Sequence, residues 1–155
     1  MALKKITDFE IVNKIMLFDK EIFRIMDMVD KKYRFNKVQQ VKDAIGELEQ
    51  MLIDSIDTVP ATPELMEEKI FLLSRSRSRL RFVEIQLYRM NDDSSISNDT
   101  IARLIETLYA LYGDYDRLLS SLKKKYESDI RGCVRDGELG MIRTANCGVE
   151  GSSNA

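Results

Sequence analysis

The most unusual chemistry in this sequence is a run of alternating serine and arginine. Residues 74–81 read SRSRSRLR. Each guanidinium presents a planar fork of donors that fits a carboxylate or a phosphate. On a helix the arginines would divide into two pairs on nearly opposite sides, Arg75 with Arg79 and Arg77 with Arg81. Because the flanking residues have a helical apolar pattern, we expect this division rather than the single face that a strand would give.

Three roles are open for this arginine cluster. The leading interpretation is a solvated or ion-paired region, in which Arg77 lies near Glu84 and Arg81 near Glu84 or Ile85. The second role is a salt-bridge network between subunits, for which arginine suits bidentate carboxylate pairing. The third and least favoured is contact with nucleic-acid phosphates. No aromatic residues interleave with the arginines, and the formal net charge of the chain is −2.

Several enzyme and metal chemistries are excluded by composition. The chain has no histidine, which removes Ser-His-Asp and Cys-His nucleophiles, histidine-containing zinc sites and the Glu-x-x-His di-iron motif. No phosphate-binding GxxxxGK[ST] loop is present. Residues 91–95 faintly resemble a calcium loop, but Ile96 and Ala102 stand where glycine and glutamate are needed. We therefore expect no catalytic residue, no metal and no cofactor.

The elements that must position these residues are helices. Apolar residues at steps of three and four predict helices over about 8–34, 36–56, 63–90 and 98–131. Thr62-Pro63 is a strong helix-start signal, and Ser97 or Asn98 can cap the fourth helix. The boundary near Phe35-Asn36 is the weakest, because no glycine or proline separates the first two helices. The predicted fold is an all-α bundle of about four long amphipathic helices, arranged up and down.

The composition changes after Gly132, which we expect to end the fourth helix in the left-handed conformation. Four of the seven glycines follow it. We therefore predict a helical bundle domain over residues 1–132 and an extended C-terminal arm over 133–155. Such an arm has too few apolar residues to fold by itself, so a neighbouring subunit would order it. Its expected anchors are Val134, Leu139, Met141 and Ile142.

The fourth helix is also rich in tyrosine. Core-edge packing is the leading interpretation, and a contact surface is the rival, because tyrosine is enriched at interfaces. The predicted interface residues are Arg75, Arg77, Arg79, Arg81, Tyr109, Tyr112, Val134, Leu139, Met141 and Ile142.

The expected location is intracellular. The longest aliphatic and aromatic run is Ile70–Leu73, far short of the ~20 residues that a spanning helix needs. No signal peptide is visible near Lys4-Lys5. We expect a cytoplasmic protein, or one within a virion assembled there. In either case Cys133 and Cys147 would be unpaired thiols.

The architecture favours a non-enzymatic structural or assembly protein. In architecture alone, a helical body joined to an extended C-terminal segment resembles the helical-bundle connector or adaptor subunits of viral and phage particles. The expected partners are copies of the chain itself and a neighbouring structural subunit, with no membrane. One alternative is a regulatory adaptor that binds a single protein partner. A nucleic-acid-associated protein using residues 75–81 is the least favoured.

Overall fold

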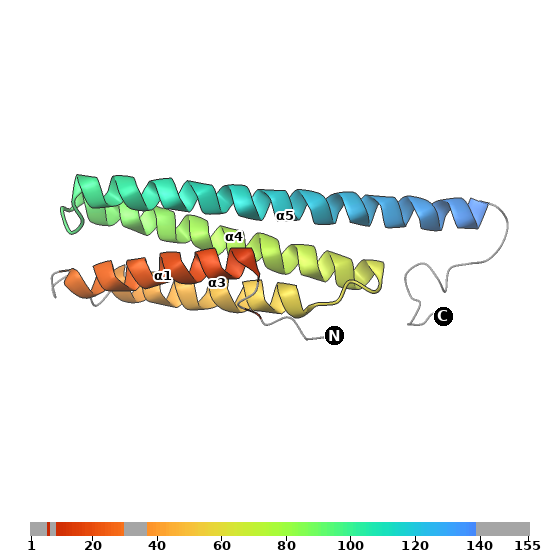
Figure 1. Ribbon diagram of the computed structural model, residues 1–155, viewed down its shortest axis with the longest axis horizontal. Coiled ribbons are helices and arrows are strands. Elements are labelled where there is room, and N and C mark those ends of the chain that lie inside the picture. Colours follow the sequence, from red (N-terminus) through yellow and green to blue (C-terminus); the bar gives the residue numbers. More distant parts are fainter. Residues whose placement is uncertain (1–5, 7–8, 30–36, 139–155) are drawn as a thin grey trace.

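The computed structural model describes residue 6 and residues 9–29 and 37–138, with only the helical backbone described over 133–138. Within these residues there are four α-helices and no strand: α1 (Glu10–Met28), α3 (Gln39–Asp57), α4 (Pro63–Asp92) and α5 (Asn98–Glu138). Successive helices run in opposite directions (Figure 1). The predicted all-α, up-down bundle is confirmed.

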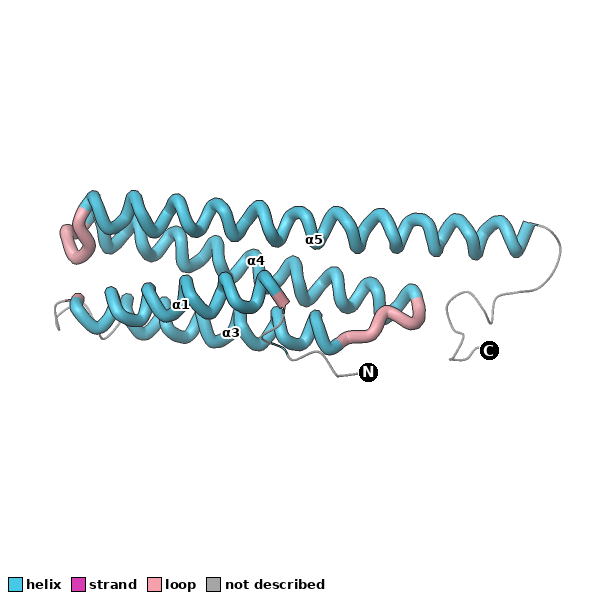
Figure 2. Tube along the Cα trace, viewed as in Figure 1, coloured by secondary structure: helices cyan, strands magenta, loops and turns pink. Residues whose placement is uncertain are grey.

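The four helices differ greatly in length. α1 and α3 have 19 residues each, α4 has 30 and α5 has 41. At 1.5 Å per residue, α1 is about 28 Å long and α5 about 62 Å. α5 therefore extends along α4 and beyond it, whereas α1 flanks less than half of α5 (Figure 2). None of the helices in the described part of the chain is long and apolar enough to cross a bilayer.

The core is built from the apolar stripes that the sequence predicts. The stripe of α1 is buried at every position: Ile11, Ile15, Phe18, Ile22, Ile25 and Val29. Of the residues that widen this stripe, Val12 and Met26 are buried, whereas Met16 and Phe23 are exposed. α1 therefore packs on its neighbours through one face and leaves apolar side chains on the other.

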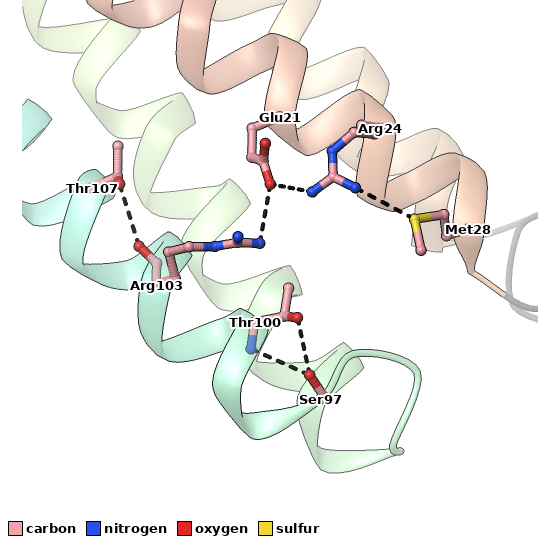
Figure 3. Close-up of polar contacts among 7 residues, drawn as sticks. All are labelled: Glu21, Arg24, Met28, Ser97, Thr100, Arg103 and Thr107. Atoms are coloured by element: carbon pink, nitrogen blue, oxygen red, sulfur yellow. Dashed lines mark hydrogen bonds and ion pairs between the residues drawn. The ribbon is translucent and has the colours of Figure 1, made fainter.

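Two helix starts are fixed by local capping, as predicted. The Thr62 hydroxyl accepts a hydrogen bond from the Leu65 amide at 3.2 Å, and Pro63 is the first residue of α4. Ser97 precedes α5, and its hydroxyl oxygen accepts from the Thr100 amide at 3.2 Å (Figure 3). Both caps satisfy amides that the first turn of a helix leaves without a partner.

The first helix is shorter than predicted. It begins after Phe9, which makes no side-chain cap, and ends at Met28, where Val29 turns to an extended backbone with ψ 143°. Thr7 and Glu10 have the spacing of a capping box, but Thr7 lies outside the described residues. α1 and α3 run antiparallel (Figure 1), so they are separate helices rather than one bent helix.

The predicted end of the fourth helix is wrong. α5 continues through Gly132 to Glu138, so Val134 lies on helical backbone and the boundary expected after residue 132 falls inside a helix. A glycine costs a helix only about 1 kcal/mol relative to alanine, which a long helix tolerates. Leu139, Met141 and Ile142 lie outside the described residues.

Charged side chains bridge the seam between α1 and α5. The Glu21 carboxylate of α1 pairs with Arg24 on its own helix and with Arg103 of α5 at 3.1 Å (Figure 3). About two helical turns before Glu21 on α1, Lys14 pairs with Asp114 of α5 at 3.2 Å. The two guanidinium groups lower the pKa of Glu21, the hydrogen bond from Arg24 having the largest effect.

Candidate protein-interaction surface

A buried carboxylate organises the face that α4 and α5 share. Glu84 of α4 is 6% exposed, and its oxygens accept hydrogen bonds from Tyr109 at 2.9 Å and Tyr112 at 2.7 Å. Arg81, one turn earlier on α4, donates to the same carboxylate at 3.4 Å. The charge is therefore satisfied without water, as a buried carboxylate requires. Burial and the Glu84 hydrogen bond raise the pKa of Tyr112, so its hydroxyl stays a donor.

Two arginines of the predicted cluster lie against this face. The Arg77 guanidinium is 4.7 Å from the centre of the Tyr112 ring, and that of Arg81 is 5.5 Å away. Arg77 also pairs with Asp116 of α5, with 2.8 Å between Nε and Oδ1. Cation–π contact and ion pairing together hold both side chains in place.

The expected partner of Arg77 needs correction. Its carboxylate is Asp116 rather than Glu84. Arg77 and Glu84 are seven residues apart on one helix, roughly 10 Å along the axis, which is too far for a direct pair. The expected contact between Arg81 and Glu84 is confirmed.

The other two arginines lie elsewhere on α4, as a helical division requires. Arg79 pairs with Glu47 of α3 at 3.3 Å. Arg75 lies over the ring of Phe71, one turn earlier on α4, at 5.5 Å. In the described part of the chain, carboxylates therefore pair with three of the four arginines. Their role between subunits stays a prediction.

Exposed apolar side chains surround the Glu84 network. Ile85 is 48% exposed, Tyr88 43% and Tyr109 52%. The Tyr109 ring lies 5.6 Å from that of Tyr112, which is buried. We call Arg81, Ile85, Tyr88, Tyr109 and Tyr112 the α4–α5 aromatic face.

Sequence reasoning found only part of this face. It named Arg81, Tyr109 and Tyr112 as contact residues and missed Ile85 and Tyr88. A signal existed, because residues 81, 85 and 88 are spaced by four and three and so share one side of a helix. What the sequence could not show is that Glu84, expected only as a neighbour of Arg77 and Arg81, is buried and accepts hydrogen bonds from both tyrosines.

A second buried carboxyl group, that of Asp19, lies deep in the bundle, and the sequence did not indicate its burial. Asp19 of α1 is 2% exposed, and neither carboxylate oxygen has a hydrogen-bond partner among the described residues. Burial, followed by the neighbouring Glu49 carboxyl group, raises the pKa of Asp19 to about 10. The group is therefore protonated at neutral pH.

The described residues hold no group of three or more acidic or thiol side chains placed to bind one metal ion. The geometry instead combines rigid aromatic side chains, arginine and a buried acceptor. Groups of this kind recognise protein surfaces, because aromatic and arginine side chains provide most of the anchoring energy at such contacts.

Comparisons with models of protein families, with curated proteins and with solved structures find no match for this chain. The exposure and the contacts of the described residues are therefore the basis for a functional conclusion.

Proposed function

We propose that this protein is a non-catalytic structural or assembly subunit that associates with copies of itself through helix faces and its C-terminal segment. The observation that carries this proposal is the α4–α5 aromatic face. Ile85, Tyr88 and Tyr109 are all more than two-fifths exposed, on a face that the buried Glu84 organises.

The side chains of this face are already held in place, which favours a role in association over an incidental exposed patch. Tyr109 is already held by the Glu84 carboxylate, and Arg81 by the same carboxylate and the Tyr112 ring. A partner that docks on these two side chains therefore loses little of their conformational entropy. Immobilising a free side chain would otherwise cost about 0.5–1.5 kcal/mol. Tyrosine and arginine in such positions are frequent hot spots of interfaces.

The distal part of α5 supports the same proposal. Tyr126 hydrogen-bonds Glu67, close to the first residue of α4, Pro63. Beyond that level α5 runs on to Glu138 with no other described helix beside it (Figure 1). A helix that projects from its own bundle is placed to reach a neighbouring subunit.

A single partner protein of different sequence could use the same face. That alternative makes a regulatory adaptor, which would be a stable monomer or dimer whose C-terminal segment is dispensable. The mass of the isolated protein with and without this segment therefore separates the two functions.

The proposal is tested by placing a charge on the aromatic face. Tyr88→Glu and Ile85→Glu should weaken self-association at least tenfold, measured by sedimentation velocity, because a hot-spot side chain contributes about 2 kcal/mol or more. Val59→Glu is the control, since Val59 is 70% exposed in the loop between α3 and α4. Circular dichroism checks that each variant keeps its helices. Association unchanged in both face variants would overturn this role of the face.

A further inference from the structure

We propose that a groove beside the start of α1 accepts the apolar stretch Leu139–Ile142 of a second copy of this chain. The inference rests on the proposed self-association and adds the acceptor site for the C-terminal segment. It assigns a function to a surface that the described helices leave open.

The groove exists because α1 begins part-way along the bundle. α5 and α4 continue past the start of α1 (Figure 2). Beside that start the side chains leave a volume of about 420 Å³. This is within the usual range of ligand pockets, about 300–1,000 Å³. Its walls are mainly apolar and come from all four helices and the residue before α1: Phe9, Ile11, Leu52, Leu73, Leu118 and Leu122.

The occupant should be apolar and carry charge only at its ends. Residues 139–142 read LGMI, with Glu138 before them and Arg143 after them. Charged residues of both signs also line the groove: Glu10, Lys69, Asp114 and Arg117. An uncharged core with one acid and one base beside it therefore matches the apolar walls and a rim that carries both signs.

The same chain cannot supply this occupant. Sixteen residues of α5 separate Leu122, the groove residue nearest the helix end, from Glu138, a distance of about 24 Å. Ile142 is four residues past Glu138, and four extended residues span at most about 14 Å. The apolar stretch therefore falls short of its own groove and has to enter that of another copy.

Paired variants of the full chain test this contact. Met141→Glu disables the inserted stretch and Leu118→Glu disables the groove; Leu118 is 40% exposed, so the change leaves the core intact. Ser121→Arg, an exposed position on the same wall, is a second groove variant. Leu17→Glu is the matched control. Leu17 is exposed and lines a different groove, which lies along the seam between α1 and α5.

Light scattering gives the readout. Each disabling variant alone should associate at least tenfold more weakly than the original chain. An equal mixture of Met141→Glu and Leu118→Glu chains should recover part of the association, because the first still offers a groove and the second an intact stretch. Leu17→Glu should associate like the original chain.

The possible failures are distinguishable. If the original chain stays at 17.9 kDa at every concentration, the proposed function fails and this contact with it. If the chain associates but the groove variants do so equally well, the assembly stands and the groove assignment is overturned. If both single variants dissociate and the mixture recovers nothing, insertion of one copy into another is overturned.

Discussion

Asp19 shows how one residue makes the stability of this bundle depend on pH. Its carboxyl group is buried without a hydrogen-bond partner among the described residues, and its pKa is raised from 3.8 to about 10. Between these two pH values the folded state binds a proton that the unfolded state lacks. The free energy of unfolding therefore falls as pH rises through this range.

Replacing this carboxyl group with an amide should remove that dependence. We expect Asp19→Asn to gain roughly 1–3 kcal/mol more stability at pH 8 than at pH 4, because the amide needs no proton to be buried uncharged. Urea unfolding at the two pH values measures the difference. Asp129→Asn, at an exposed position of α5, should show no such difference. An equal effect of Asp19→Asn at both pH values would mean that the buried group is already neutralised in another way.

A buried hydroxyl, that of Ser76, interrupts the buried apolar side chains of α4 between Leu73 and Leu80. Ser76 is fully buried and donates to the Leu48 carbonyl at 2.8 Å, so the hydroxyl of Tyr115 donates to Ser76 at 2.6 Å. One serine therefore joins α3, α4 and α5. Burial raises the pKa of Tyr115, which keeps this donor protonated.

Removing either hydroxyl should have unequal effects. Ser76→Ala leaves the buried Tyr115 hydroxyl without its partner and should cost about 1–3 kcal/mol. Tyr115→Phe leaves the bond from Ser76 to Leu48 intact and should cost about 1 kcal/mol. Thermal unfolding of both variants and of the double variant measures this, and the double variant should lose less than the sum. A larger loss for Tyr115→Phe than for Ser76→Ala would contradict the assigned directions of donation.

At the scale of elements, helix starts that depend on contacts within a few residues could be predicted from the sequence. A helix end that depends on a balance between small free-energy terms could not. Thr62 and Ser97 cap their helices through bonds that span three residues, so the sequence alone locates them. Gly132 was read as a stop, although glycine disfavours a helix by only about 1 kcal/mol. Whether a helix passes such a residue depends on the stability of both neighbouring turns, which local pattern does not give.

Gly132→Ala tests whether α5 continues. Apart from its chain neighbours and the backbone of its own helix, no described atom lies within 4 Å of the position that a Cβ would occupy there. In a continuous helix, alanine should raise local stability by about 0.5–1 kcal/mol. Slower amide hydrogen exchange over residues 129–136 would show this gain. Gly46→Ala, equally open in the middle of α3, is the control. Faster exchange after Gly132→Ala, with a stabilising control, would mean that residue 132 needs the left-handed conformation that ends a helix.

At the scale of the whole molecule, the number and directions of the helices followed from periodicity, but their register did not. Arg77 pairs with a residue 39 positions away in the sequence, and α1 begins part-way along the bundle and leaves part of α5 uncovered. Such contacts depend on how helices slide and rotate against each other, which apolar spacing leaves open. The sequence therefore indicated arginine and tyrosine as contact residues without showing how Glu84 arranges them.

The central claim, self-association with a functional C-terminal segment, is tested most directly by the molar mass of the pure protein. We would measure the full chain and a chain ending at Glu138 by light scattering over a hundredfold range of concentration. The full chain should reach a multiple of 17.9 kDa, and the shorter chain should do so only at higher concentration or not at all. A full chain that remains a monomer throughout the range would contradict the claim and favour an adaptor that needs a different partner.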